Sequence, residues 1–400
     1  MTMALIRRDG RTAVFSLGLG LVYFIAGKLG LQLALLNSSA SAIWPPTGIA
    51  LAALMILGLR VWPGVFLGAF LVNITTQGSI GTALGIAAGN TLEGVLGAWL
   101  VGRFAGGCRT FDRPRDVLKF MVLAGMVAPA VSATIGVTSL SLGGFSAWEN
   151  FRAVWLTWWM GDVGGALIVA PVILLWVENP RIRWSRAQIA EGALLLSLIV
   201  LVGKATFSEW TTLESERFIL KFMCLPLLVW TAFRWGPRDT ATALFILSIV
   251  TAISLATGQR PLSQEVKNEM LLMVQGFLEV IAMTTLPLAS AILDRKRTEE
   301  ARSRTEEILA GTIERHRRIL DGALDAVVTM DARGKITGWN PQAERIFGWT
   351  SEEVVGRSLA EILIPEKFRE SHRRGLDRCG ATGEAAFLNK LREAASLHRD

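Results

Sequence analysis

The sequence has 400 residues, of which 51% are hydrophobic and 19% are Asp, Glu, Lys or Arg. A soluble globular protein has a charged fraction of about a quarter. Here the deficit lies in residues 12–293, whereas residues 294–400 are rich in Arg and Glu. The composition therefore excludes a single soluble domain and predicts a membrane domain followed by a soluble one. The net charge of +7 does not indicate nucleic-acid binding, because much of the excess lies in short loops between apolar runs.

Apolar runs fill the first part of the chain, and a bilayer core requires about 20 apolar residues per helix. Ten candidate spans follow in chain order: 13–36, 44–59, 62–76, 80–101, 117–140, 153–176, 188–206, 217–234, 239–257 and 269–293. The second and third are short enough to form a tight or partly re-entrant hairpin. Residues 1–12 have no small-residue cleavage site after a short apolar core, so they are predicted to be a cytoplasmic tail before a retained first span.

The loops between these spans differ in charge. With the N-terminus in the cytoplasm, most basic residues fall in the inside loops: Arg7, Arg8, Arg11, Arg60, Arg103, Arg109, Arg113, Arg115, Lys119, Arg181, Arg183, Arg186, Arg234 and Arg238. The outside loops hold Arg152, Arg217, Arg260 and Lys267. This asymmetry follows the positive-inside rule. It predicts a multi-pass protein of the bacterial inner (plasma) membrane with both termini in the cytoplasm.

Polar side chains fall inside several predicted spans, where a charge is costly. They are Lys28, Glu93, Asp162 and Glu279, with Asn90 one helical turn before Glu93, and Trp158 and Trp159 one turn before Asp162. In one interpretation they line a buried polar pocket, or a switch whose protonation or ligand state shifts helix packing. In the other they hold helices together, with Lys28 paired to one of the acids.

Trp44, Pro45 and Pro46 begin the second span, where two prolines favour a rigid helix start. From there, WPPTGIALAALMILGLRVWPGVFLGAFLVN, GNTLEG and WLTWWMGDVGGALIVAP resemble the MASE1 family of bacterial membrane sensors. The resemblance covers about residues 13–293. It implies signal input rather than transport, upstream of PAS, histidine kinase, diguanylate cyclase or phosphodiesterase modules. It leaves the stimulus open.

Residues 294–322 are predicted to continue the last span as one helix. Leu309, Ile313, His316, Leu320 and Ala323 follow the 4-3-4 spacing of a coiled-coil seam. This spacing favours a homodimer through the linker, which could transmit a shift of the last membrane helix. The alternative is a solvated spacer helix that transmits nothing.

From residue 323 the pattern changes to strand, turn and strand, AVVTMD and KITGWN, with Asp331 and Gly334 suited to a tight turn. Asn340 is a predicted N-cap, and Thr350 and Glu353 form a predicted capping box. The stretch DARGKITGWNPQAERIFGWTSEEVVGRSL resembles the PAS family, an α/β fold, with a helix near 366–380 and a strand near 387–397. Because the last strands are missing, the sequence is expected to be a piece of a longer protein.

The segment PEKFRESHRRGLDRCGATGEA resembles the PAS subclass that binds haem. The resemblance places His372 at the position of the proximal iron ligand, and Arg378 and Arg392 at polar pocket positions. A neutral imidazole suits haem iron. The alternative is a PAS domain without haem, in which His372 lies on a solvated helix.

The sequence contains no P-loop, zinc-protease, phosphoacceptor or cyclase motif, and its three cysteines lie far apart. The predicted fold is mainly α: a helix bundle of about ten spans, a coiled-coil linker (294–322) and an incomplete PAS domain (323–400). The predicted function is sensory input to a two-component histidine kinase. The alternatives are input to a diguanylate cyclase or phosphodiesterase, or a transporter with a regulatory PAS tail. Expected partners are the lipid bilayer, a second copy and a membrane or cytoplasmic signalling protein.

Overall fold

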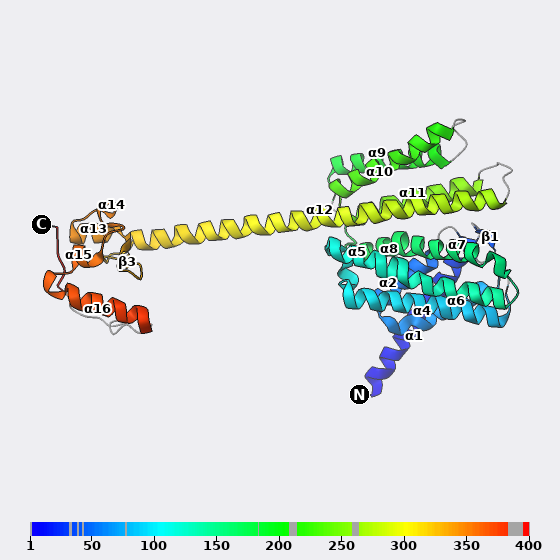
Figure 1. The fold of residues 1–400 in the computed structure, drawn as a ribbon, viewed down its shortest axis with the longest axis horizontal. Helices are drawn as coiled ribbons and strands as arrows, with labels where there is room; N and C mark the ends of the chain where they lie inside the picture. The colour runs from blue at the N-terminus through cyan, green and yellow to red at the C-terminus, as the bar shows by residue number, and fades with distance from the viewer. Residues whose placement is uncertain are drawn as a thin grey trace. The chain divides into compact units, whose positions relative to one another are not determined.

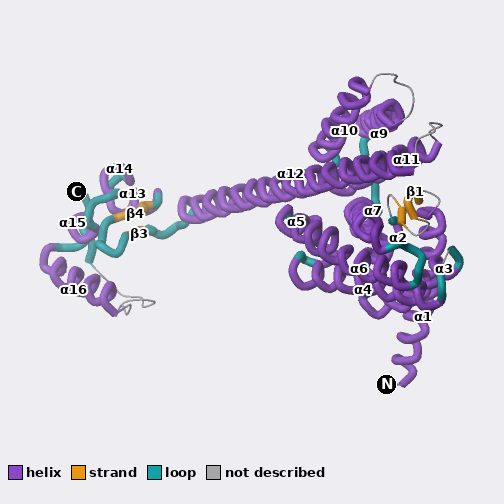
Figure 2. The backbone as a smooth tube through the Cα atoms, turned by 45° about the vertical axis from the view of Figure 1, so that its right-hand side comes forward, coloured by secondary structure: helices purple, strands orange, loops and turns teal. Residues whose placement is uncertain are grey.

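The computed structural model describes residues 2–31, 34–37, 40–41, 44–76, 78–182, 184–207, 214–257, 264–382 and 395–399. The chain divides into two compact units, Met1–Thr298 and Glu299–Asp400. Each unit is described by itself. The elements are labelled in Figure 1, and Figure 2 shows that helices dominate.

The first unit is built almost entirely from helices. They are α1 (Thr2–Leu31), α2 (Pro45–Leu57), α3 (Trp62–Ile74), α4 (Ile80–Phe104), α5 (Pro114–Val122), α6 (Ala128–Leu142), α7 (Phe151–Gly164), α8 (Ala170–Glu178), α9 (Arg186–Phe207), α10 (Glu214–Arg234), α11 (Pro237–Thr257) and the first part of α12 (Gln264–Asp321). Short 3-10 helices are η1 (Leu59–Val61), η2 (Gly107–Asp112) and η4 (Trp148–Asn150). A small antiparallel pair, β1 (Ala34–Asn37) and β2 (Ala40–Ser41), precedes α2.

Six helical stretches in the described residues are long and apolar enough to cross a membrane: Thr12–Leu31, Ile80–Phe104, Pro114–Leu142, Trp148–Glu178, Arg186–Ala205 and Glu269–Asp321. Shorter apolar helices are Pro45–Leu57, Leu59–Ile74 and Met223–Arg234. A helix lies within every predicted span, although the first helix ends at Leu31 and the predicted bound of 36 falls in β1. The count of ten is not confirmed, because several of these helices are too short to span by length alone.

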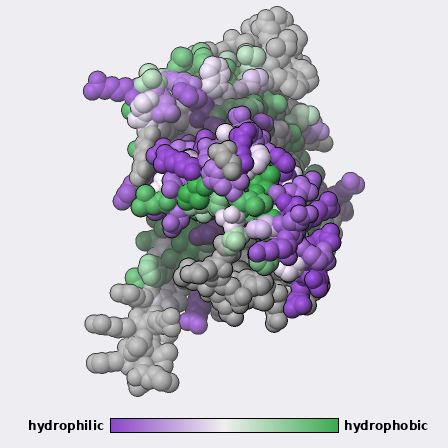
Figure 3. All heavy atoms as spheres, turned by 90° about the vertical axis from the view of Figure 1, so that its left-hand side faces the viewer, coloured by the Kyte–Doolittle hydropathy of each residue, from purple (hydrophilic) through white to green (hydrophobic). Residues whose placement is uncertain are grey.

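Apolar side chains face outward along this unit, as lipid contact requires. On α1, Leu17, Leu21 and Leu29 are 63%, 61% and 58% exposed. The one face drawn in the space-filling view carries both hydrophilic and hydrophobic residues (Figure 3). The outward apolar face and the buried small residues together identify a membrane domain, because membrane helices associate through close packing rather than through a hydrophobic core.

Two helices of this unit change to a π-helical turn within the bundle. The turns are η3 (Leu123–Val127), between α5 and α6, and η5 (Gly165–Val169), between α7 and α8. A proline lies two residues after each turn, Pro129 and Pro171. Proline has no N–H for the helical ladder, so the wider turn accommodates the lost bond. The two π-turns contact each other.

In the second unit, α12 runs on to Asp321 and is followed by an antiparallel pair, β3 (Val328–Met330) and β4 (Ile336–Trp339). Four helices follow: α13 (Pro341–Phe347), α14 (Ser351–Val354), α15 (Leu359–Leu363) and α16 (Glu366–Thr382). The linker helix, the strand pair and the helix near 366–380 are confirmed. The predicted strand near 387–397 lies largely outside the described residues.

The predicted local signals of this unit are confirmed as well. The side chain of Asn340 accepts a hydrogen bond from the N–H of Ala343 at 2.9 Å, which caps α13. Thr350 and Glu353 form the capping box of α14, and Gly334 has a positive φ of 75° in the turn between the strands. These contacts surround a small core whose centre is Ile336, Trp339, Ala343, Val354 and Ile362.

Candidate functional site

A cluster of polar side chains lies inside the membrane domain, contributed by five helices. We call it the polar cluster; its members are Tyr23 (α1), Thr47 (α2), Asn90 and Glu93 (α4), Ser132 (α6), and Trp158 and Asp162 (α7). None of them is more than 6% exposed. Burying so many polar groups in a membrane bundle is costly unless they bond to one another. The cluster is therefore the main candidate for a functional site.

Two carboxylates of the cluster meet at one hydroxyl group. Thr47 Oγ1 lies 2.7 Å from Asp162 Oδ1 and 3.4 Å from Glu93 Oε2. The other oxygens, Glu93 Oε1 and Asp162 Oδ2, are buried and have no hydrogen-bond partner. Among the described residues, no Lys or Arg forms a salt bridge with either acid. Within the part of the chain that the structure describes, the arrangement is a buried pair of acids without a counter-ion.

The remaining members form a chain of hydrogen bonds across the bundle. Trp158 Nε1 donates to Ser132 Oγ at 3.2 Å, and Ser132 Oγ donates to Asn90 Oδ1 at 2.8 Å. Asn90 Nδ2 in turn donates to the Tyr23 hydroxyl at 2.9 Å. Since α7, α6, α4 and α1 each supply one link, a shift of one helix changes the bonding of the others.

Close backbone packing brings Thr47 to Asp162. The two prolines start α2, and the N–H of Trp44 donates to the carbonyl oxygen of Gly161 at 2.9 Å. A Cβ atom on Gly48 would overlap the carbonyl oxygen of Gly165, and one on Gly165 would overlap that of Trp44. Only glycine permits this approach of α2 to the π-turn η5, one turn after Asp162.

Three predicted site residues lie outside the cluster. Lys28 Nζ donates to the carbonyl oxygen of Thr75 at 2.9 Å and to Thr76 Oγ1 at 2.8 Å. This corrects the interpretation that pairs Lys28 with an acid. Trp159 Nε1 donates to the carbonyl oxygen of Met126, at the end of the π-turn η3, at 2.9 Å. Glu279 is buried on α12, where its Oε1 atom has no hydrogen-bond partner.

Of the predicted residues, the structure brings together Asn90, Glu93, Trp158 and Asp162 in the polar cluster. Trp44, Pro45 and Pro46 set the start of α2 beside it.

Sequence reasoning missed Tyr23, Thr47 and Ser132. Tyr23 is the only tyrosine of the chain, and Thr47 directly follows the two prolines. These sequence features could have identified both residues as candidates. Ser132 had none, because serine is common in membrane helices.

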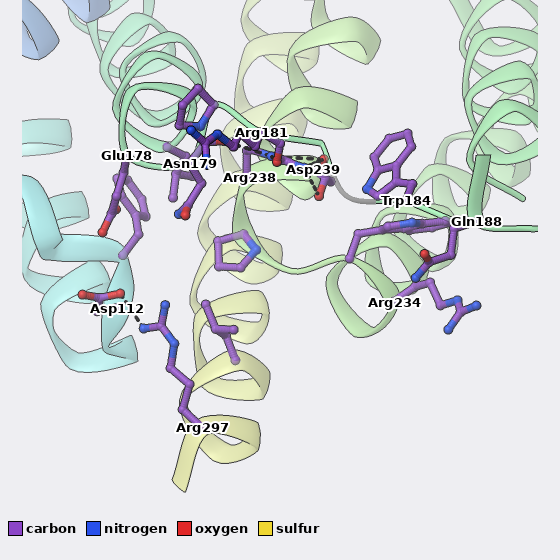
Figure 4. Close-up of a pocket in the computed structure, with 16 residues that line it drawn as sticks. Asp112, Glu178, Asn179, Arg181, Trp184, Gln188, Arg234, Arg238, Asp239 and Arg297 are labelled. Carbon is purple, nitrogen blue, oxygen red and sulfur yellow. Dashed lines mark hydrogen bonds and ion pairs between the residues drawn. The ribbon is translucent and has the colours of Figure 1, made fainter. Parts of the chain in front are cut away.

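A second feature is a pocket of about 760 Å³ at the end of the membrane domain where α12 leaves it (Figure 4). Arg297 on α12 forms an ion pair with Asp112 at 2.6 Å, and Ser290 Oγ donates to the carbonyl oxygen of Phe111 at 2.8 Å. Both partners belong to η2, which follows α4. These contacts tie α12 to the segment that directly follows α4, the helix that carries Glu93.

Basic loops gather at this end of the unit. Arg238 pairs with the adjacent Asp239 and donates to the carbonyl oxygens of Asn179 and Arg181 (Figure 4). Lys296 Nζ reaches the carbonyl oxygen of Phe233. The α8–α9 and α10–α11 connections therefore lie together beside α12, as the predicted topology requires for inside loops.

The PAS unit presents the predicted haem ligand on α16. His372 is half-buried, and its Nδ1 atom has no hydrogen-bond partner. Burial lowers the pKa of His372, which favours the neutral imidazole that binds iron. This histidine fits the donor that haem requires. Arg378 lies on the same helix, while Arg392 lies outside the described residues.

Comparisons with known proteins define the family. The MASE1 family matches residues 15–297, and the PAS fold matches residues 314–391. The chain belongs to the MASE1 family of membrane sensors and continues into a PAS domain, as the sequence resemblance predicted. No solved structure matches the chain significantly.

Three relatives are similar to parts of the chain. The "Probable diguanylate cyclase DgcE" of Escherichia coli K12 is 23% identical over 358 residues, which are 87% of this chain and 30% of that protein. "Sensor protein FixL" of Bradyrhizobium diazoefficiens is 32% identical over 84 residues, 21% of this chain and 16% of FixL. An uncharacterized protein of Azorhizobium caulinodans is 40% identical over 100 residues, 25% of this chain and 13% of that protein. The chain thus spans less than a third of the length of each relative.

Proposed function

We propose that this chain is the sensory input region of a bacterial signalling protein, in which the polar cluster responds to a stimulus and α12 carries the response to the PAS domain. The observation that carries the proposal is the continuity of α12. This helix of 58 residues, Gln264–Asp321, contains both membrane-domain residues and the predicted linker up to Asp321. A continuous helix transmits a displacement at one end to the residues beyond it.

A connected route leads from the cluster to α12. Glu93 lies on α4, which ends at Phe104; the short segment after it leads into η2, where Asp112 bonds to Arg297 of α12. A stimulus that changes the bonding of Glu93 would bias two packings of α4, and the two packings would hold α12 differently.

The test compares two threonine variants in the native protein. Thr47→Val removes the hydroxyl shared by both carboxylates, and Thr284→Val removes an exposed hydroxyl that bonds only to its own helix, to Val280 O. Signalling output is expected to change in Thr47→Val and to stay at the wild-type level in Thr284→Val. Equal output from wild type and both variants, at equal amounts of protein in the membrane, would refute the proposal.

The output class is proposed to be a histidine kinase or a diguanylate cyclase. MASE1 domains precede both, and the similarity to DgcE, which extends over both domains of this chain, favours the cyclase. The test supplies membranes containing the longer protein with ATP or with GTP. Autophosphorylation from ATP would identify the kinase, and cyclic dinucleotide formed from GTP would identify the cyclase.

A homodimer is proposed through the linker seam. Leu309, Ile313 and Leu320 are 59%, 60% and 40% exposed in the single chain, although the seam spacing favours burial against a second helix. Ile313→Cys is expected to form an intermolecular disulfide in membranes. Arg315→Cys, on the opposite face of the same helix, is the control, and equal cross-linking of both variants would contradict a specific coiled coil.

The orientation proposed from the loop charges places both termini and the α12 exit in the cytoplasm of a bacterium, with the membrane domain at 13–293 in the inner membrane. The clustering of the basic connections at one end supports this assignment. A reporter enzyme fused after residue 293 is expected to be active only if it functions in the cytoplasm. Activity of a periplasmic reporter at that position would reverse the orientation.

Haem binding by the PAS domain is proposed with His372 as the iron ligand. The full chain, purified in detergent and mixed with haem, is expected to show the absorption spectrum of histidine-ligated haem, and His372→Ala is expected to lose it. His316→Ala, which changes a linker histidine, should keep the spectrum. Equal spectra for both variants would exclude His372 as the ligand.

A further inference from the structure

We infer that the polar cluster is a proton-binding site in which Glu93 and Asp162 hold one proton between them, and that gain or loss of this proton is the stimulus that the membrane domain detects. The second half of this inference rests on the proposed sensory function. The first half stands on the geometry of the two carboxylates alone.

Hydrogen-bond stoichiometry is the first argument. A threonine hydroxyl donates one hydrogen and accepts through its lone pairs, yet Thr47 Oγ1 faces an oxygen of each acid. The shorter distance, 2.7 Å, assigns the Thr47 hydrogen to Asp162. Glu93 Oε2 then faces the Thr47 lone pairs, which is favourable only when Glu93 itself carries a hydrogen. Protonated Glu93 therefore donates its hydrogen to Thr47 Oγ1, and the Thr47 hydroxyl donates its own hydrogen to Asp162.

No described Lys or Arg side chain forms an ion pair with either acid. Each ion taken from water into a protein interior costs several kcal/mol, and two carboxylates that share one hydroxyl would also repel each other. Arg103 on α4 and Arg152 on α7 are each ten residues from the nearest acid, about 15 Å along a helix, and Lys28 bonds to Thr75 and Thr76. One shared proton removes one of the two charges.

Among the described residues of the elements packed against the two acids, one further titratable side chain joins the cluster. Tyr23 on α1 is fully buried and joins the cluster through Asn90. The described residues of α2, α3, α6 and η5 contain no titratable side chain directed at the pair. The pair therefore governs the charge of the site, and Tyr23 lies where it can report a change.

A metal ion fits the site less well than a proton. Calcium takes six to eight oxygens at about 2.3–2.6 Å, whereas the two acids have only Glu93 Oε1 and Asp162 Oδ2 free. Among the described residues, no three His, Cys, Asp or Glu side chains gather to hold a metal. The direct contact between Thr47 and Asp162 also leaves no space for an ion between them.

The single tyrosine of the chain provides the test. The full chain is labelled with 3-fluorotyrosine, placed in lipid nanodiscs, and followed by fluorine NMR as the pH is varied. One resonance is expected, from Tyr23, and it should shift along a single-proton titration curve. Glu93→Gln with Asp162→Asn should abolish the shift. Glu279→Gln, which changes a buried acid outside the cluster, should leave it unchanged.

Three results would overturn the inference: a resonance that does not shift with pH, a shift that persists in the double variant, or a shift caused by sodium or calcium at constant pH. A distance measurement between α12 and η2 in the same samples separates the two halves. If Tyr23 titrates while α12 stays in place, the proton site stands and the sensory function fails. If α12 moves in cluster variants but Tyr23 does not titrate, the sensory function stands and the proton site fails.

Discussion

Replacing Thr47 by valine should destabilise the membrane domain, because valine has nearly the shape of threonine but no hydroxyl. The change removes the bond of 2.7 Å to Asp162 and leaves that carboxylate, whose Oδ2 already lacks a partner, without the Thr47 bond. Leaving a buried acceptor unsatisfied costs about 1–3 kcal/mol, and more for a charged group. We expect a loss of about 2–3 kcal/mol in the free energy of unfolding.

A buried thiol makes this loss measurable. Cys224 is 1% exposed, so a thiol-reactive fluorophore labels it only as the domain unfolds. The assay heats the protein in detergent after Cys108 and Cys379 have been changed to serine. Thr47→Val should label at a temperature several degrees below the parent, and Thr47→Ser, which keeps a hydroxyl, should lie close to it. Thr284→Val should change stability by less than about 0.5 kcal/mol. Equal midpoints for Thr47→Val and Thr284→Val would refute the role assigned to the hydroxyl.

Three further predictions address other parts of the chain. Gly165→Ala should reduce the free energy of unfolding by about 1–3 kcal/mol and lower the labelling temperature, because its Cβ would overlap a facing carbonyl oxygen. Gly102→Ala, whose Cβ would have nothing within 4 Å, should leave the labelling temperature unchanged. Arg297→Asp alone should change signalling output, and the exchanged pair Asp112→Arg with Arg297→Asp should restore it. Loss of the ion pair in Arg297→Asp should reduce the free energy of unfolding by less than about 1 kcal/mol, because the pair is partly exposed. The capping bonds lower the pKa of Glu353. The stability that ionised Glu353 gives the PAS unit is therefore present at neutral pH and is lost as the pH falls through that lowered pKa. Hydrogen exchange in α14 should become faster in acid, and Glu353→Gln should remove this pH dependence.

Most of the fold was predictable from local sequence patterns. Apolar runs located the six long apolar helical stretches of the described residues, because a bilayer demands long apolar segments with their own hydrogen bonds. In the PAS unit, Asn340 and Thr350 identified the helix starts because their side chains bond to backbone N–H groups within three residues. The span count was harder, since α2 and α3 are short and length alone does not decide whether such helices cross.

The candidate site was predictable only in part. Glu93 and Asp162 stood out because a carboxylate in a membrane span needs a reason. That they meet at Thr47 depends on the packing of α2 against η5, which joins residues 115 positions apart and has no signature in local sequence. The π-turns before Pro129 and Pro171 were also unpredicted, because a proline in a membrane helix is compatible with a kink, a break or a wider turn.

If the polar cluster controls the position of α12, a distance measured between spin labels on α12 and beside η2 should depend on Thr47. Labels are placed at Arg113, beside η2, and at Thr298 on α12, in the full chain in nanodiscs. The distance distribution is expected to differ between the parent and Thr47→Val, and to be the same in the parent and Thr284→Val. Identical distributions in all three proteins would contradict the coupling.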